Sequence, residues 1–371
     1  MGQPRPNLSA GDPVSAIETP ALIVDLDALE ANIGLMASYA AALGIRLRPH
    51  FKTHKCLEIA RRQVAAGAVG LCCQKTTEAE ALVSGGIRDV LLTNEVLAPA
   101  KIQRLMYLTE RARLGVCVDS SAGLEALIAC RAAADQLDVY VELDVGAGRC
   151  GVDKPAAVLD IARRIADQRH LRFVGLHAYH GRAQHIRGIG ERAAAIAQSA
   201  RLVETVQDLL SREGLSAPIV TGGGTGTFTR EAASGCWNEI QPGSYVFMDR
   251  DYADNERDEA APSFLHSLFI LCMVQSRRSA HVVVDAGHKA HAIDSGMPAI
   301  AGRPDLQYQR PSDEHGIVVA EKGATLPDLG EALRLIPGHC DPTVNLYDWL
   351  ICIRGSEVVE IWPIDARGAL C

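Results

Sequence analysis

The 371-residue sequence lacks the features that mark several classes of protein. It has no run of about eighteen apolar residues, which a membrane-spanning helix needs, and its N-terminal MGQPRPNLSAGD has no apolar stretch like that of a signal peptide. Basic residues form no cluster, and the net charge of −8 disfavours binding to nucleic acid. We therefore expect a cytoplasmic protein that acts on a small molecule, with neither a membrane nor a nucleic acid as partner.

Eleven cysteines are present, but no two of them form a CxxC pair. Several lie in apolar runs, which is typical of small buried thiols, so a disulfide framework or a zinc ribbon is not expected. An apolar content of 48% with 22% charged residues is ordinary for a globular enzyme.

A strand-like run followed by a helix-like run recurs between residues 21 and 250. The predicted strands are residues 45–49, 69–72, 90–93, 114–118, 139–144, 173–178 and 219–221, with 239–240 and 245–247 together as the eighth. The predicted helices are residues 29–43, 56–66, 77–83, 101–111, 123–133, 156–166 and 186–210. Eight such units close as a (β/α)8 barrel of the TIM type.

The pattern changes after residue 250. Residues 251–263 are polar and acidic, which predicts a linker, and alternating apolar runs follow with almost no helical spacing. We predict an all-β domain from residues 264–371 joined by residues 1–20, with 20–25 as a strand that enters the barrel. The fold class is then α/β plus all-β.

The segment RPHFKTHK ends the first predicted strand and carries Lys52. Active sites of such barrels lie at the C-terminal ends of the strands, so Lys52 is a candidate Schiff-base nucleophile. An amine reacts this way when its pKa is lowered, and we expect Arg48, Lys55 and nearby imidazoles to lower it. From this stretch alone, a solvated basic turn is an equal alternative.

Two glycine-containing segments follow later strands. The loop TGGGTGT, residues 221–227, lets backbone N–H groups approach an anion, which suggests a phosphate cradle. The loop LDVGAGRCG presents Arg149, whose guanidinium can bind a phenolate or carboxylate. A plain turn and a surface ion pair, respectively, are the alternatives.

Histidines and acids mark two further segments. HAYHGRAQH places Tyr179 at a strand end and offers His180 and His185 as general bases. PGHCDP places His339 and Asp341 two residues apart, so on an extended strand both could bind one divalent ion. A turn with a capping aspartate is the alternative.

These segments, together with TPALIVDLDALEANI, GLCCQKTTEAEAL and PGSYVFMD, resemble the alanine-racemase-type (fold-type III) pyridoxal 5'-phosphate enzymes, and within them the D-threonine aldolase and D-serine dehydratase group. The resemblance covers nearly the whole chain. The combination of RPHFKTHK with the late HCD is more specific than either piece.

The resemblance implies a role for each candidate. Lys52 would hold pyridoxal phosphate, His339 and Asp341 a divalent metal, and His185 or, as second choice, His180 would be the base. Mn²⁺ or Mg²⁺ is expected, because an oxygen ligand suits these ions. The remaining cofactor contacts would be Gln74, Arg149, Tyr179, Thr221, Gly223, Gly224, Thr225 and Tyr245.

The resemblance also implies the reaction: metal-dependent retro-aldol cleavage of D-threonine and other D-β-hydroxy-α-amino acids to glycine and an aldehyde. The alternative is dehydration of D-serine or D-threo-3-hydroxyaspartate. By the same resemblance, the dehydratases of this group carry a His-x-Cys metal pair, whereas this chain has His-x-Asp. A racemase needs no metal pair, and non-catalytic pyridoxal phosphate-binding barrels lack a β-domain. A homodimer is expected by analogy.

Overall fold

The computed structural model describes residues 4–130, 136–259 and 261–371. Eight parallel strands follow one another around the predicted barrel. Backbone hydrogen bonds from Val69 N to Leu47 O (2.9 Å) and from Cys72 N to Pro49 O (2.8 Å) join the first strand to the second, so the ring closes. The eight strands are β2 (Arg46–Leu47), β3 (Leu71–Cys73), β4 (Asp89–Glu95), β5 (Arg113–Val118), β6 (Leu137–Glu142), β7 (Leu171–His177), β8 (Ile219–Gly222) and β9 (Glu239–Ile240).

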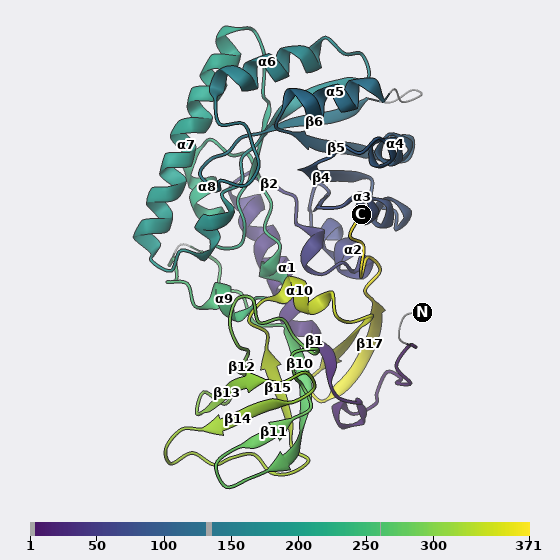
Figure 1. Ribbon diagram of the computed structural model, residues 1–371, viewed down its shortest axis with the longest axis vertical. Helices are drawn as coiled ribbons and strands as arrows, with labels where there is room; N and C mark the ends of the chain where they lie inside the picture. The colour runs from purple at the N-terminus through teal and green to yellow at the C-terminus, as the bar shows by residue number, and fades with distance from the viewer. Residues whose placement is uncertain (1–3, 131–135, 260) are drawn as a thin grey trace.

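Helices cover the outside of the barrel (Figure 1). Helix α6 shows why they form: Pro155 occupies its first turn, and Val158, Ala162 and Ile165 repeat at helical spacing and are buried. The covering helices are α1 (Leu26–Ala42), α2 (Leu57–Ala65), α3 (Thr76–Ser84), α4 (Pro99–Leu108), α5 (Ser121–Ala129), α6 (Pro155–Ala166), α7 (Ile189–Arg212) and α8 (Phe228–Ser234).

The barrel prediction is confirmed, with local corrections. The predicted strand 245–247 is wrong, because Ser244–Val246 form a 3-10 turn, η4. The predicted helix 101–111 ends at Leu108, and the predicted helix 123–133 ends at Ala129, while residues 131–133 lie outside the described part of the chain.

A mostly antiparallel nine-stranded sheet forms the β-domain, which lies below the barrel in Figure 1. Strand β1 belongs to this sheet, between β10 and β16, and not to the barrel where the sequence pattern placed it. Helix α9 (Arg250–Ala253) occupies the start of the predicted linker, and α10 (Cys340–Val344) follows β15. The domain limits themselves stay a prediction. The nine strands are β1 (Ala21–Asp25), β10 (Leu268–Arg277), β11 (Val282–Val284), β12 (Ala299–Ile300), β13 (Leu306–Pro311), β14 (Gly316–Ala320), β15 (Ala332–Ile336), β16 (Trp349–Arg354) and β17 (Glu357–Pro363).

One apolar cluster joins the barrel to the β-domain. It contains Leu29 and Met36 of α1, Phe247 after η4, and Ile270 and Leu335 of the second sheet, all of them fully buried. Burial of a side chain of this size stabilises the fold by about 1.5–3 kcal/mol. The cluster therefore fixes α10, which follows β15, against the open end of the barrel.

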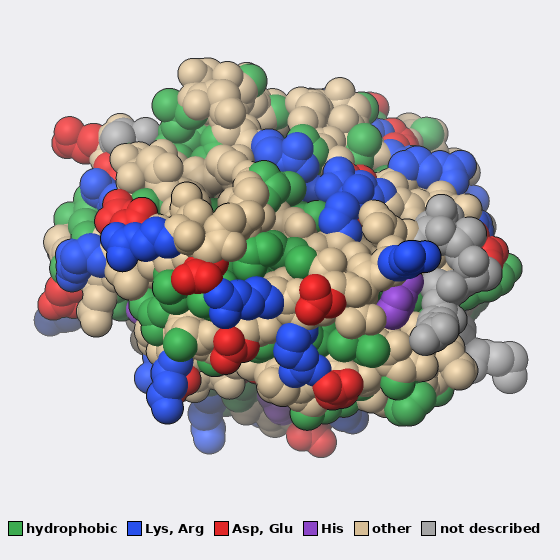
Figure 2. Space-filling model, turned by 90° about the horizontal axis from the view of Figure 1, so that it is seen from above, with side chains coloured by type: hydrophobic (Ala, Val, Ile, Leu, Met, Phe, Trp, Pro, Cys, Tyr) green, Lys and Arg blue, Asp and Glu red, His purple; other side chains and the backbone are tan. Residues whose placement is uncertain are grey.

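Charged side chains of both signs lie on the end of the molecule farthest from the β-domain. Figure 2 looks onto the end of the molecule where α5 and α6 lie, and basic and acidic side chains are interspersed there. Arg164 of α6, for example, pairs with Glu125 of α5. Among the helices of the described residues, none combines the length and the apolar character that crossing a membrane requires.

A buried arginine braces the barrel interior. Arg48 is 1% exposed, and its guanidinium donates to Glu239 Oε1 (2.9 Å) and Asp89 Oδ1 (2.7 Å).

Arg48→Ala leaves the Glu239 carboxylate buried without this partner, so we expect the free energy of unfolding to fall by about 3–5 kcal/mol. Denaturant titration followed by circular dichroism measures this. Arg164→Ala, which breaks an exposed pair, should cost less than about 1 kcal/mol. An equally small loss for Arg48→Ala would contradict the bracing role.

Candidate active site

A pocket opens at the C-terminal ends of the barrel strands. Six predicted site residues line it, from five different strand-to-helix connections: Lys52, Gln74, Arg149, Tyr179, Gly224 and Thr225. The pocket is also lined by residues that the sequence analysis did not select: His50, Thr53, Thr93, His177, Gln241, Gly243, Ser244 and Tyr252.

Lys52 lies in a short 3-10 turn, η2 (Phe51–Thr53), directly after the first barrel strand. The side chain of His50 starts this turn by accepting a hydrogen bond from Lys52 N (3.3 Å). The Lys52 ammonium makes a close ion pair with Asp341 Oδ2, on α10 of the same chain. The candidate lysine and one candidate metal ligand therefore meet within one chain.

The predicted lowering of the Lys52 pKa is wrong for this structure. Burial lowers the pKa of Lys52, but the Asp341 carboxylate, together with Tyr179 and Glu78, raises it, and the resulting pKa lies above its ordinary value. The two cationic residues that were expected to lower this pKa are paired with other carboxylates. Arg48 pairs with Glu239 and Asp89, and Lys55 pairs with Glu78 (3.2 Å).

His339 and Asp341 each offer a donor atom that could bind a metal ion. His339 Nδ1 lies 2.7 Å from Asp294 Oδ2, which orients the ring and leaves Nε2 free to bind an ion. Asp341 Oδ1 is buried and has no hydrogen-bond partner among the described residues. Burial raises the pKa of Asp341, but Lys52 and His339 lower it more, to about 2, so it is a carboxylate. These donors fit a divalent cation.

The geometry of this pair differs from the predicted strand. His339 precedes α10 in an extended conformation, whereas Asp341 lies in the first turn of the helix. The argument that the two share a face of a strand is therefore wrong. Neither residue lines the pocket itself, and Asp341 reaches it through its contact with Lys52. Cys340 between His339 and Asp341 is fully buried in the apolar cluster, and its backbone N–H donates to Asp249 Oδ2 (3.0 Å).

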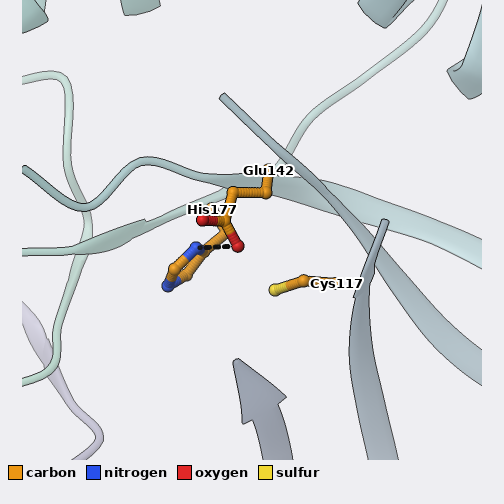
Figure 3. A group of neighbouring side chains, drawn as sticks. All are labelled: Cys117, Glu142 and His177. Carbon is orange, nitrogen blue, oxygen red and sulfur yellow. Dashed lines mark ion pairs between the residues drawn. The ribbon is translucent and has the colours of Figure 1, made fainter. Parts of the chain in front are cut away.

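Two other groups of potential metal ligands lie at the strand ends, and the sequence analysis missed both. Figure 3 shows Cys117, Glu142 and His177, with an ion-pair contact of 3.2 Å between His177 Nδ1 and Glu142 Oε2. Burial raises the pKa of Cys117 well above its ordinary value, so the thiol stays protonated and is a poor metal ligand. The second group comprises Glu95, Asp119 and Cys150. Neither group includes His339 or Asp341.

Arg149 lies across the mouth of the pocket, with its guanidinium carbon 5.7 Å from the centre of the Tyr179 ring. Its Nη2 lies 3.8 Å from Glu142 Oε1, and the side chain is half exposed. Burial raises the pKa of Tyr179, so its hydroxyl stays protonated. The partner Glu142 is buried, so this contact differs from the surface ion pair that was the alternative for Arg149.

The glycine loop forms a cradle that side chains would fill. A Cβ atom at Gly224 would lie 2.5 Å from Gln184 Oε1, and one at Gly222 would lie 2.1 Å from Ala178 O. Gly223 has a φ of +76°, which L residues with side chains rarely adopt. Larger residues at these positions would therefore displace the neighbouring segments, and a glycine loop of this kind can bring backbone N–H groups close to an anion.

Three predicted cofactor contacts do not line the pocket, namely Thr221, Gly223 and Tyr245. The Thr221 hydroxyl donates a hydrogen bond to Glu239 Oε1 (2.8 Å) and accepts one from Gln241 Nε2 (2.7 Å). Tyr245 is fully buried and its hydroxyl accepts from Gln63 Nε2 (3.0 Å), away from the pocket.

Neither candidate base lines the pocket directly. His185 Nδ1 lies 2.5 Å from Asp251 Oδ2, and its ring centre lies 5.8 Å from that of Tyr252, which does line it. The hydrogen bond with Asp251 raises the pKa of His185. His180 instead accepts from Ala183 N (3.3 Å), and burial lowers its pKa. The contact with Tyr252 places His185 beside the pocket.

Comparison with known proteins agrees with this geometry. The family described as alanine racemase, N-terminal domain, matches residues 24–251, and the putative serine dehydratase domain matches residues 267–353. The chain belongs to the alanine racemase family. Within this family, D-threonine aldolase from Arthrobacter sp. is 46% identical over 365 residues, which cover 98% of this chain and 96% of that protein.

Three further relatives cover almost the whole chain. The solved structure of D-threonine aldolase from Filomicrobium marinum is 46% identical, with a TM-score of 0.94 over 98% of this chain and 99% of that one. The 3-hydroxy-D-aspartate aldolase of Paracoccus denitrificans is 45% identical over 363 residues, 95% of this chain and 93% of that protein. D-threo-3-hydroxyaspartate dehydratase from Delftia sp. is 28% identical over 379 residues, 95% of this chain and 98% of that protein.

Pyridoxal phosphate is the cofactor expected for this family, and the pocket fits it. Its lining combines a lysine amine, the glycine loop at Gly224, and an arginine that lies against a tyrosine ring. A Cβ at Gly243 would approach Thr53 Oγ1 to 2.6 Å, so the pocket wall is also closely packed there.

Proposed function

We propose that the protein is a pyridoxal phosphate- and divalent-metal-dependent lyase that cleaves D-threonine and related D-β-hydroxy-α-amino acids to glycine and an aldehyde. The contact between Lys52 and Asp341 carries this proposal, because it joins the amine that would hold the cofactor to the pair that would hold the metal. The 46% identity to an aldolase over nearly the whole chain supports it.

The bound cofactor would supply an electron sink for the bond that breaks at Cα. Lys52 would hold it covalently, Arg149 would orient it from the side of the ring, and the loop at Gly224 and Thr225 would bind its phosphate. Thr221, Gly223 and Tyr245 would act through their neighbours: Tyr245 N, for example, donates to Thr225 Oγ1 (3.0 Å).

His339 and Asp341 would bind a divalent ion, with Mn²⁺ or Mg²⁺ as the expected metal, and orient the β-hydroxyl of the substrate. His185 would take the hydroxyl proton, because Asp251 holds its ring beside Tyr252, which lines the pocket. Backbone N–H of Asp251 donates to Gly338 O (3.2 Å), which ties α9 to the metal-binding turn. A homodimer and a cytoplasmic location remain parts of the proposal.

Replacing Asp251 should change the pH dependence of the reaction. A histidine acts as a base only when neutral, and the hydrogen bond with Asp251 raises the pKa of His185. In Asp251→Asn this effect is lost, so the acid limb of kcat/KM should move to lower pH. Asp254→Asn, an exposed carboxylate on the same helix, should leave the limb in place. A shift to higher pH, or none, would contradict the role of Asp251.

Dehydration is the second candidate, and the metal pair argues against it. The ligand position carries an aspartate whose Oδ1 is unpartnered, while the neighbouring Cys340 thiol is buried away from it. An oxygen donor suits Mn²⁺ or Mg²⁺ rather than a thiolate-bound zinc ion.

The proposal is tested by aldehyde release from the purified protein supplied with pyridoxal phosphate and Mn²⁺. We expect acetaldehyde from D-threonine, none from L-threonine, and loss of the activity when a chelator removes the metal. Acetaldehyde from L-threonine, or unchanged activity after chelation, would show that the proposed substrate class or metal dependence is wrong.

A further inference from the structure

The tail of the chain, residues 364–371, leaves the β-domain and lies against barrel helices that follow two pocket residues. Figure 1 shows it in yellow, running from the end of β17 to α2 and α3. Ile364 is buried in the apolar cluster that joins the barrel to the β-domain, and Ala366 is buried in the main core of the barrel. The tail is therefore packed into both parts of the fold.

The tail caps the first turns of α2 and α3. Within the described chain, the residue before each of these helices makes no capping hydrogen bond with its side chain. Instead, Asp365 Oδ2 accepts a hydrogen bond from Leu57 N (2.7 Å), and Cys371 O accepts one from Thr77 N (3.1 Å). Because first-turn N–H groups have no partner inside a helix, these contacts help to fix where both helices begin.

The tail also holds the backbone between Lys52 and α2. Lys55 lies in this segment and has a φ of +50°, a left-handed conformation that residues with a side chain seldom adopt. Such a conformation persists where surrounding contacts hold it. Lys55 O accepts a hydrogen bond from Ala366 N (3.0 Å), so the tail supplies one of these contacts.

The tail further reaches α10, the helix whose first turn carries a candidate metal ligand. Asn345 follows α10, and its Oδ1 accepts from Gly368 N (3.0 Å) of the tail and from Lys55 Nζ (3.2 Å). Lys55 Nζ also pairs with Glu78 Oε1 (3.2 Å), and Glu78 Oε2 accepts from Gln74 N (2.7 Å). The Asn345 amide therefore joins the tail and α10 to the two segments that follow the first barrel strands.

We propose that the tail is a positioning element of the active site, which acts through Asp365 and Asn345 to hold the segment of Lys52 against the helix of Asp341. This inference rests on the proposed function, which assigns the cofactor to Lys52 and a metal ligand to Asp341. The described tail residues do not line the pocket, so they act on the geometry of the residues that do.

A β-hydroxy amino acid shows why this geometry matters. Its amine would bond to the cofactor and its β-hydroxyl to the metal, and these two groups lie on adjacent carbon atoms. The distance between the cofactor and the metal must therefore match one short span, and a small misplacement of either group slows the reaction strongly. D-Alanine, which has an amine but no β-hydroxyl, does not depend on this match.

Asn345→Ala tests the inference. We expect the dissociation constant of Mn²⁺, titrated into the metal-free protein, to rise by about tenfold, as it does when residues that orient metal ligands are replaced. The dissociation constant of D-alanine, measured from the shift of the cofactor band, should not change, whereas kcat/KM for D-threonine should fall. Asn345→Asp keeps the acceptor oxygen and should restore both the Mn²⁺ affinity and the turnover.

Asp365→Ala provides a second test at the other end of the tail. It removes the cap of α2 and should weaken Mn²⁺ binding without changing D-alanine binding. Asp25→Ala is the matched control, because Asp25 Oδ1 caps α1 by accepting from Ala28 N (3.1 Å), and none of the residues of α1, all of them described, lines the pocket. This control should lower the thermal midpoint by a similar amount and leave Mn²⁺ affinity unchanged.

Hydrogen exchange gives a readout that needs neither cofactor nor metal. In the unloaded protein, peptides covering residues 51–57 and 340–345 should exchange faster in Asn345→Ala and Asp365→Ala than in Asp25→Ala. Equal exchange in all three variants, or Mn²⁺ and D-alanine constants that change together, would overturn the inference. If the wild type releases no aldehyde from D-threonine, the proposed reaction is refuted, and the exchange and Mn²⁺ measurements still decide the role of the tail.

Discussion

Lys52→Ala is expected to abolish the visible absorbance band of the bound cofactor and to lower aldehyde release from D-threonine by about 10³-fold or more. The amine is the group that would bond to the cofactor and, once released, would be available for proton transfer. Absorbance spectra and an aldehyde assay of the purified variant measure both effects.

A nearby lysine provides the control for this prediction. Lys75 follows Gln74 and is not part of the pocket lining, so Lys75→Ala should keep both the band and the activity. A band that survives Lys52→Ala would assign the Schiff base to another lysine. The RPHFKTHK segment would then be a solvated basic turn, which was the alternative interpretation of this stretch.

Asp341→Ala is expected to lower metal-dependent turnover by about 10²- to 10³-fold while the cofactor band remains, because metal polarisation contributes several kcal/mol to such reactions. The variant loses the buried oxygen that has no other partner. It also releases Lys52 from its ion pair, so the band is the readout that shows the cofactor is still bound.

Asp294→Asn tests metal binding without removing the ion pair between Lys52 and Asp341. Asp294 orients His339 and does not contact Lys52, so this variant should weaken metal binding by about 10- to 100-fold without altering the band. Titration of the metal-free protein with Mn²⁺ measures the affinity. If Asp341→Ala and Asp294→Asn both left the affinity for Mn²⁺ unchanged, His339 and Asp341 would not be the metal ligands.

The barrel and the pocket residues could be predicted from local patterns. Strand-like runs alternate with helical ones, and Lys52, Gln74 and Arg149 each follow such a run, so the barrel geometry brings them to one end. Polar residues at strand ends were the available signal for Thr93 and His177 as well, but they stand within apolar runs and were not selected.

What the sequence did not reveal depends on contacts between distant segments. The pKa of Lys52 is raised in part by Asp341, 289 residues away, and the buried Tyr245 hydroxyl accepts a hydrogen bond from Gln63, 182 residues away. Strand β1 pairs with β10 and β16, and such pairing across the chain leaves no local pattern. These features follow from the folded arrangement rather than from the spacing of neighbouring residues.

The most direct test of the proposed reaction is the product balance of the Mn²⁺-loaded holoenzyme with D-threonine. Retro-aldol cleavage predicts one glycine and one acetaldehyde for each D-threonine consumed, with no ammonia. One 2-oxobutanoate and one ammonia for each D-threonine would contradict the account and assign the site, with its His339 and Asp341 pair, to dehydration.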